Sequence, residues 1–210
     1  MESTIATIVI LVFTMSIFST VTGTKSEPVL KNDNTAIIEQ NTPICTTIDS
    51  TPVPKKEFAD CEEGELYRIR NFVLNYGNNI SELDADEIYN NIIKHSRYYN
   101  LNPKIVAALI ARESKFNKFA VSSSGAQGLG QLLPSTAHGM GIDDPFNIDQ
   151  NVMGTTRYLR SLIDRFQGEN SLTYALASYL EGPNAVKRNG GFKFPSKYYI
   201  EDIYRLYDKI

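Results

Sequence analysis

The sequence predicts a mainly α-helical fold. Apolar side chains recur at helical spacing in five stretches after residue 80, and helix-starting or helix-ending residues border most of them. No convincing pair of strands is present. With 210 residues, of which 42% are hydrophobic, and an irregular N-terminal part, the chain has room for one domain of ordinary size.

The first two of these helices are marked by their starts. The chain becomes helical after Gly64, and Asp84 followed three residues later by Glu87 resembles a capping box. The apolar stripe of this helix runs to about residue 100 through Ile88, Ile92 and Tyr99. Asn102 and Pro103 suit the N-cap and first position of the next helix, which is expected from Pro103 to Phe116.

The three later helices are marked by their apolar residues and their ends. One carries Ile148, Val152, Thr155, Leu159, Leu162, Ile163 and Phe166 and ends at Gly168. The next carries Leu172, Leu176, Tyr179 and Leu180 and ends at Gly182-Pro183, and the last carries Tyr199, Ile200, Ile203, Leu206 and Tyr207. Outside these stripes, His95 is expected on a helix surface and His138 at the surface or a cleft rim.

Glu113 is the unusual residue of the helix over 103–116. It continues the i, i+3, i+4, i+7 spacing of Val106, Leu109 and Ile110, which places a carboxyl group on the apolar stripe. Because burial disfavours the charged form, the pKa of Glu113 should rise above its ordinary value of about 4.3. A carboxyl group that holds its proton near neutral pH can act as a general acid. The alternative is a structural carboxylate paired with a distant arginine.

The segment after Glu113, Ala120 to Ala137, is too rich in Gly, Ser, Ala and Gln to form a plain helix. Its glycines, Gly125, Gly128 and Gly130, permit backbone angles and close approaches that other residues resist. Its serines and glutamines supply neutral hydrogen-bonding groups, and such groups beside a buried acid suit a sugar. The glycine spacing is not the dinucleotide fingerprint and follows no strand, so a nucleotide-binding loop is rejected.

The N-terminal residues divide into two parts. Residues 1–23 contain an almost wholly apolar run, Ile5 to Phe18, that resembles the hydrophobic region of a signal peptide. No positive charge precedes the run and no clear cleavage site follows it, so an uncleaved N-terminal anchor is the alternative. Residues 24–63 contain four prolines without sustained periodicity and are expected to form a linker of low order. The folded domain is expected over 64–210.

Charge and cysteine content bear on partners and cofactors. The net charge is −3, and Lys55-Lys56 is the most basic cluster, so neither a nucleic-acid partner nor electrostatic membrane-surface binding is expected. Cys45 and Cys61 are the only cysteines. An exported chain could join them in a disulfide or leave two separate thiols. Neither has a histidine at metal-ligand spacing, so no metal site is expected.

Several short blocks occur in order along the chain. They are Glu113-Ser114-Lys115-Phe116-Asn117, Ala120-Val121-Ser122, Gly125 to Pro134, Thr136-Ala137, Asn147-Ile148, Gly154 with Tyr158-Leu159, and Ala177 to Pro183. Together they resemble the soluble lytic transglycosylase family, whose catalytic domain is similar to goose-type lysozyme. The resemblance covers roughly Ile88 to Leu206, and ordered blocks are more specific than one motif. It implies a lysozyme-like α-helical catalytic domain over 64–210 with an active-site cleft.

The resemblance also implies an activity. The chain would be a peptidoglycan lytic transglycosylase that cleaves the β-1,4 bond between N-acetylmuramic acid and N-acetylglucosamine, leaves 1,6-anhydromuramoyl ends and needs no cofactor. Glu113 would be the single catalytic residue, first acid and then base. Substrate-binding residues would be Ser122, Gln131, Tyr179, Gly125, Ala126 and Leu129, with Tyr179 also orienting the Glu113 carboxyl group.

Location and partners follow from the same resemblance and the N-terminal run. The partner would be peptidoglycan glycan strands, and the protein would act outside the cytoplasm as a periplasmic, secreted or membrane-anchored enzyme. A cell-envelope or secretion assembly is a further expected partner.

Three positions depart from the family pattern. Leu180 stands where the family usually has Asn, and Glu181 stands where Ala is common, which leaves the substrate contacts of this segment open. Gly130 replaces a frequent Met and is expected to fit a tight cleft wall.

Two alternative functions stay open. A lysozyme-type muramidase on the same scaffold would need a second carboxylate, such as Asp143 or Asp144. Loop and helix-cap roles are favoured for these two residues and for Asp149 and Glu181. A non-catalytic glycan-binding protein is the other alternative, although a buried carboxylate is hard to explain without chemistry.

Overall fold

The computed structural model describes residues 63–78 and 80–210. The helices in order are α2 (Glu63–Tyr76), α3 (Glu82–Tyr98), α4 (Pro103–Ser114), α5 (Pro134–Gly139), α6 (Ile148–Arg165), α7 (Ser171–Glu181), α8 (Pro183–Arg188) and α9 (Phe194–Tyr207). Two isolated bridge pairs, Val121–Gln127 and Gln127–Leu132, are the only extended pairing in the described part. The predicted mainly α fold is confirmed.

The predictions for the N-terminal part lie outside the described residues. They concern the apolar run over 5–18, the linker and both cysteines. Across 63–78 and 80–210, none of the helices combines the length and the apolar character that a membrane span requires.

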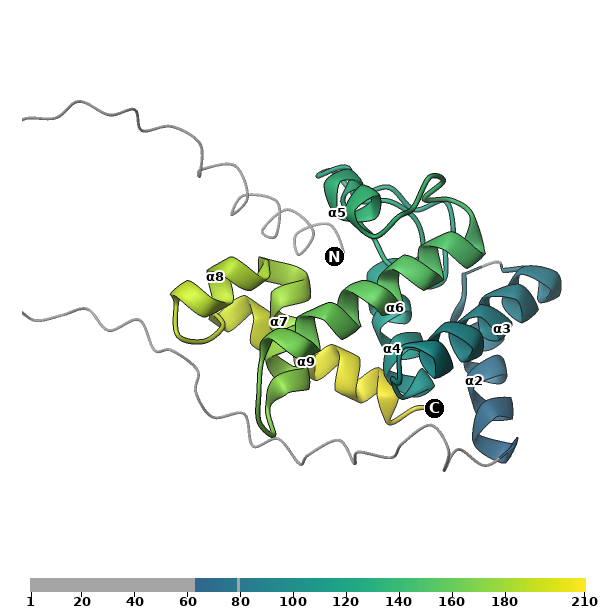
Figure 1. The fold of residues 1–210 in the computed structure, drawn as a ribbon. Helices are drawn as coiled ribbons and strands as arrows, with labels where there is room; N and C mark the ends of the chain where they lie inside the picture. Colours follow the sequence, from purple (N-terminus) through teal and green to yellow (C-terminus); the bar gives the residue numbers. More distant parts are fainter. Residues whose placement is uncertain (1–62, 79) are drawn as a thin grey trace, which may run out of the picture. The chain divides into compact units, whose positions relative to one another are not determined.

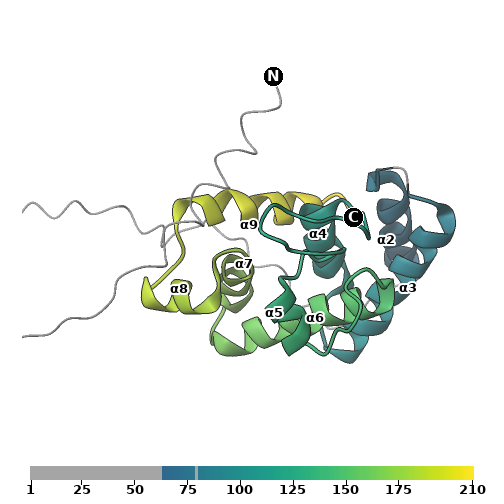
Figure 2. The ribbon, with the colours of Figure 1, turned by 90° about the horizontal axis from the view of Figure 1, so that it is seen from above.

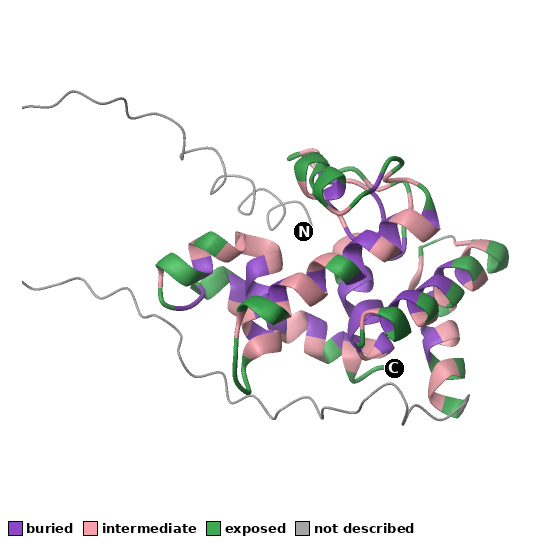
Figure 3. Cartoon of the chain, viewed as in Figure 1, coloured by how far each residue is buried: buried purple, intermediate pink, exposed green. Residues whose placement is uncertain are grey.

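Helix α4 is enclosed by other helices (Figures 1 and 2). It packs against α2, α3 and α9, and every residue from Ile105 to Ala111 is buried (Figure 3). As predicted, Asn102 caps it by accepting the Lys104 N–H at 2.9 Å, and Pro103 occupies its first turn. The helix is therefore buried around its whole circumference instead of along one stripe.

Helix α4 ends at Ser114, two residues before the predicted end. Lys115 and Phe116 both have positive φ angles, 51° and 61°, and such a left-handed pair cannot continue a right-handed helix. The chain therefore turns away immediately after Glu113 and leads into the Gly-rich segment.

The ends of the other helices show where capping and helix-breaking residues were enough to predict a boundary. Helix α3 is capped by Ser81, whose Oγ accepts the Asp84 N–H at 3.1 Å, so the predicted capping box at Asp84 is wrong and Asp84 lies in the first turn. Helix α6 begins at the Asn147 cap, as its apolar spacing predicts. Helix α7 ends at Gly182, whose φ is 84°. The short helices α5 and α8 have no counterpart in the predicted elements.

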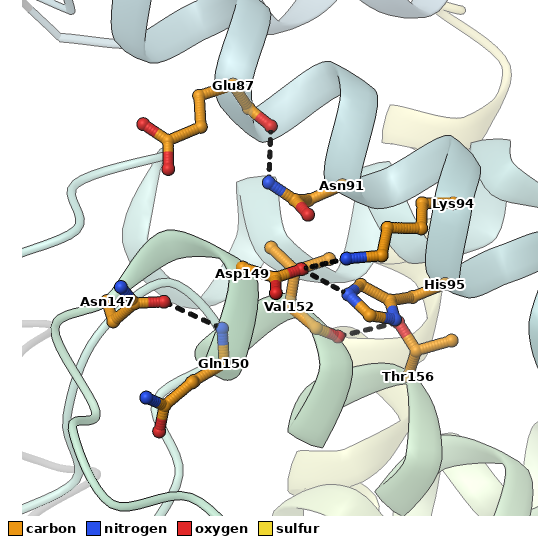
Figure 4. Close-up of polar contacts among 9 residues, drawn as sticks. All are labelled: Glu87, Asn91, Lys94, His95, Asn147, Asp149, Gln150, Val152 and Thr156. Carbon is orange, nitrogen blue, oxygen red and sulfur yellow. Dashed lines mark hydrogen bonds and ion pairs between the residues drawn. The ribbon is translucent and has the colours of Figure 1, made fainter.

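His95 joins α3 to the start of α6. It is only 7% exposed, so the prediction of a surface histidine is wrong, whereas His138 is exposed as expected. His95 Nε2 lies 2.7 Å from Asp149 Oδ1, and Lys94 Nζ donates to the same oxygen at 2.9 Å (Figure 4). These two hydrogen bonds lower the pKa of Asp149. Helix α6 covers this face of α3, which the sequence of α3 alone does not reveal.

Candidate active site

Glu113 lies in the last turn of α4, where the helix leaves the core. The residue is half-buried, whereas the seven-residue stretch through Ala111 is buried. Tyr199 of α9 donates its hydroxyl hydrogen to Glu113 Oε1. No described residue donates a hydrogen bond to Oε2, so this oxygen stays available to a substrate.

The pKa of Glu113 is raised from its ordinary value of 4.5 to about 7. Burial of the carboxyl group is the largest cause, and the hydrogen bond from Tyr199 and the charge of Arg112 act in the opposite direction. The predicted elevation is confirmed. Near neutral pH the group exists in both protonation states, so it can both give and accept a proton.

Tyr199 is fixed by its surroundings. It is 4% exposed, and the guanidinium carbon of Arg112 lies 5.3 Å from the centroid of its ring. Arg112 is in turn held by Asp202, with 3.3 Å between Arg112 Nε and Asp202 Oδ2. Burial raises the pKa of Tyr199 well above its ordinary value. The phenol therefore stays protonated, and remains a donor, wherever Glu113 titrates.

Tyr179 contacts the Gly-rich segment. Its hydroxyl donates to the carbonyl oxygen of Gly130 at 2.8 Å, and its predicted role in orienting the Glu113 carboxyl group stays a prediction. Burial is the main cause that raises the pKa of Tyr179, and the negative charge of Glu113 adds to it. Tyr179 is therefore close enough to Glu113 to interact electrostatically, while it holds the Gly-rich segment.

Ser122 and Gln131 stabilise the Gly-rich segment from within. Ser122 Oγ accepts the N–H of Ala126 at 3.0 Å. Gln131 Nε2 donates to the carbonyl oxygens of Ala120 and Gly128, both at 3.0 Å. Both side chains are half-buried. These bonds account for the two residues structurally, and their predicted contacts with a sugar stay predictions.

Gly125, Ala126 and Leu129 can offer a sugar little beyond their backbone. Gly125 has a φ of 80°, and no heavy atom lies within 4 Å of the place where a Cβ would be, so the position is open. Ala126 is 7% exposed and Leu129 0%. The side chain of Leu129 belongs to the main hydrophobic core, so these three residues could line a cleft mainly with their peptide groups.

Asn151 of α6 ties the Gly-rich segment to the helical core. The residue is 1% exposed, and its Oδ1 accepts the N–H of Gly130 at 2.8 Å. Its Nδ2 donates to the carbonyl oxygens of Gln127 at 3.2 Å and Pro145 at 2.7 Å. Thr155, one turn later, donates to Asn151 Oδ1 at 3.4 Å. A buried amide with all its groups paired holds the segment in one position.

This close approach requires glycine at two positions. A Cβ on Gly130 would lie 1.8 Å from Thr155 Oγ1, and a Cβ on Gly128, whose φ is 74°, would lie 2.2 Å from the Pro145 carbonyl oxygen. The tight wall expected at Gly130 is confirmed, and Thr155 is the residue that fills the space beside it.

The other candidate carboxylates hold loops and helix ends, as predicted. Asp144 Oδ1 accepts the N–H of Phe146 at 2.9 Å, and the backbone N–H groups of Asp143 and Asp144 donate to Gln150 Oε1 at 2.8 and 3.0 Å. Asp149 pairs with α3. Glu181 accepts a backbone N–H at 2.9 Å and a serine hydroxyl at the start of α9.

Comparison with known proteins agrees with this arrangement. The sequence profile described as the Transglycosylase SLT domain matches residues 90–199, just over half of the chain. The chain belongs to the SLT transglycosylase family. The part that matches the SLT domain begins in α3, includes Glu113, Asn151 and Tyr179, and ends at Tyr199.

Individual relatives of this SLT domain are similar over shorter stretches. A protein named "Transglycosylase" from Enterobacteria phage PRD1 is 38% identical over 101 residues, which are 48% of this chain and 36% of the relative. A "Membrane-bound lytic murein transglycosylase F" from Desulfosudis oleivorans is 40% identical over 88 residues, which are 40% of this chain and 19% of the relative. The chain therefore corresponds to about a third or less of the length of these relatives.

Solved structures show the same fold as this SLT domain. The 70 kDa soluble lytic transglycosylase from Escherichia coli superposes with a TM-score of 0.52 at 17% identity, over 72% of this chain and 31% of that one. A lytic transglycosylase Slt from Pseudomonas aeruginosa gives a TM-score of 0.51 over 71% of this chain and 30% of that one, also at 17% identity. The lysozyme-like helical fold is thus confirmed.

Two residues of the site, Tyr199 and Asn151, are absent from the predicted site residues. Tyr199 is one of five apolar or aromatic residues on the stripe of its helix, and nothing local separates it from a core residue. Asn151 did give a signal, because it lies between Ile148 and Thr155 on the buried stripe of α6. A polar residue on an apolar stripe is the same anomaly that identified Glu113.

Proposed function

We propose that this chain is a peptidoglycan lytic transglycosylase with Glu113 as its single catalytic acid and base. Protonated Glu113 gives its proton to the oxygen of the β-1,4 bond that leaves with N-acetylglucosamine. The resulting carboxylate takes the proton of the muramoyl C6 hydroxyl, whose oxygen bonds to C1. The bond from C1 to the leaving oxygen is thus replaced by a bond from C1 to the C6 oxygen, which gives a 1,6-anhydromuramoyl end. Glu113 regains its proton in this step.

The observation that carries this proposal is the environment of Glu113. One group must act as acid and then as base, and a pKa of about 7 supports both roles at neutral pH. The Tyr199 hydroxyl donates to Oε1, so it favours the carboxylate that forms after the first step and directs the reacting proton to Oε2. Such a fixed donor needs no reorganisation during the reaction.

The charges around Glu113 favour a transglycosylase over a hydrolase. A retaining glycosidase needs a second carboxyl group about 5 Å from the first, and an inverting one about 6.5 to 9.5 Å away. Among the described residues, Arg112 is the only charged group that shifts the pKa of Glu113, and a carboxylate at such a distance would raise it. The sugar's own C6 hydroxyl then serves as nucleophile in place of water.

The direct test is mass spectrometry of the fragments that the protein releases from purified peptidoglycan. Anhydro-ended fragments are expected from the wild type and from the exposed control Glu169→Gln. Glu113→Gln should lose roughly 10²- to 10⁴-fold in rate, the usual contribution of general acid–base catalysis. Fragments with reducing ends would show a hydrolase, and the absence of fragments with any variant would show a glycan-binding protein.

We also propose that the chain is exported and meets glycan strands outside the cytoplasm. The apolar run over 5–18 supports this, and one relative's name places that protein at a membrane. Fractionation of cells expressing the full chain, with mass determination of its N-terminus, distinguishes a cleaved signal from an uncleaved anchor. Recovery of the uncleaved chain in the cytoplasm would refute the proposal.

A further inference from the structure

A cavity of about 220 Å³ lies between α2, α4 and α9, and Glu113 does not line it. Helix α2 contributes Tyr76, and the end of α4 contributes Arg112 and Lys115. The other wall is the end of α9 and the turn after it: Asp202 and Arg205, three residues apart, share one side of the helix, and Lys209 follows the end of the helix. Figure 2 shows the end of α9 beside α4, with α2 next to them.

The charges lining this cavity are mostly positive, although the chain as a whole carries −3. Four cations and one carboxylate line it. Asp202 binds two of the cations, Arg112 at 3.3 Å and Arg205 at 2.5 Å. Within the described residues, Lys115 and Lys209 have no carboxylate in ion-pair distance. The cavity therefore holds an excess of cationic donors that internal pairing does not use.

The helix dipole is a second explanation for these cations. It accounts for their positive charge but not for their convergence on one cavity. Lys115 and Lys209 follow the ends of α4 and α9, where positive charge complements the helix dipole. A dipole interaction does not require two helix ends to converge on one cavity. Convergence of cations around a cavity is the arrangement that recognises an anion.

We propose that this cavity binds an oxyanion group, a phosphate or a carboxylate. Its volume is below the range of about 300 to 1,000 Å³ typical of sites for drug-sized ligands, so it suits a small anion or one anionic group of a larger molecule. Arg112 and Arg205 present planar forks that match two oxygens of such a group. Two sources share this chemistry: a free oxyanion, and the carboxylates of peptide stems on a wall glycan.

The cavity lies next to the residues that hold Glu113. Asp202 is one helical turn after Tyr199 on α9, and the Arg112 guanidinium reaches both the Tyr199 ring and Asp202. A bound anion would contact Arg112, which also contacts the Tyr199 ring. Anion binding could therefore affect Glu113 through Arg112 and Tyr199, without direct contact with Glu113.

The test is titration of the full chain with inorganic phosphate. Binding is measured by calorimetry and by the change in melting temperature. Saturable binding is expected, beyond what sodium chloride produces at equal ionic strength. Arg205→Gln combined with Lys209→Gln should weaken binding about tenfold or more, because both remove charged donors. The matched control is Lys187→Gln combined with Arg188→Gln, which removes two cations from the last turn of α8 and should leave binding unchanged.

Asp202→Asn distinguishes a binding site from a structural ion cluster. It frees Arg112 and Arg205 from their internal partner, so phosphate should bind about 2- to 5-fold more tightly, the usual strength of an exposed ion pair. Equal phosphate binding by the wild type and the Arg205/Lys209 double variant would overturn the proposal. Weaker binding by Asp202→Asn would overturn it as well.

The source of the anion is found by competition. Soluble glycan fragments with and without peptide stems are added to phosphate-loaded Glu113→Gln protein, so that turnover plays no part. Displacement by stem-bearing fragments alone assigns the site to wall carboxylates, and retention of phosphate against both fragments assigns it to a free oxyanion. Absence of saturable binding of both phosphate and stem-bearing fragments would refute the proposal, and it would leave the proposed activity of Glu113 untouched.

Discussion

Replacement of Glu113 by Gln should stabilise the protein at alkaline pH while it abolishes activity. The folded state holds the Glu113 proton up to about pH 7, whereas the unfolded chain releases it near 4.5. Between these values the folded protein binds more protons, so stability falls as pH rises through this window. Above it, the folded protein carries an ionised carboxylate in a buried setting, and Gln has no such charge.

The magnitude follows from the size of the pKa change. A rise from 4.5 to about 7 corresponds to at most about 3.5 kcal/mol at about 1.4 kcal/mol per unit. Since Glu113 is half-buried, solvent screening reduces this, and about 1 to 3 kcal/mol is expected. For a domain of this size each kcal/mol moves the melting temperature by about 2 to 4 °C. Glu113→Gln should therefore melt several degrees higher at pH 8.

The assay is a series of thermal melts of wild type and Glu113→Gln from pH 4 to pH 8.5. The difference in melting temperature should be near zero at the acid end and should grow through the window up to pH 7. Glu169→Gln, at an exposed loop position, is the control and should show no such growth.

A Glu113→Gln variant that is destabilised equally at every pH would refute this reasoning. It would mean that Glu113 has the same pKa in the folded and unfolded states, so the raised pKa would be wrong.

Three further predictions concern the residues that hold the site. Tyr199→Phe should lower the rate and move the pKa of Glu113, read from the pH–rate profile, above about 7, because the lost hydrogen bond lowers that pKa; an unchanged profile would contradict this. Asn151→Ala should cost about 3 kcal/mol or more in urea unfolding, because it leaves the buried Gly130 N–H unpaired. Gly130→Ala should be strongly destabilising, and Thr155→Gly should restore part of the loss in a double-mutant cycle, since Thr155 occupies the Cβ position; strict additivity would exclude that clash.

Much of the helical architecture was predictable from local sequence. Asn102 and Pro103 start α4, Asn147 starts α6, and Gly182 ends α7, because caps and breakers act through neighbouring backbone groups. Glu113 was recognisable as well, since a carboxyl group at helical spacing with apolar residues must be desolvated wherever that helix packs.

The contacts around Glu113 were not predictable, because they join segments far apart in the chain. Tyr199 is 86 residues from Glu113, and its stripe on α9 predicts burial without saying which helix covers it. For the same reason His95 was wrongly assigned to the surface.

By itself the sequence determined most of the longer helices, the family and the residue with the anomalous carboxyl group, since these depend on interactions within a few turns. The tertiary structure decided which tyrosine holds Glu113, how Asn151 anchors the Gly-rich segment and which cations meet beside Asp202. These depend on how α4, α6, α7 and α9 pack, and packing selects one arrangement from many that the same apolar stripes would allow.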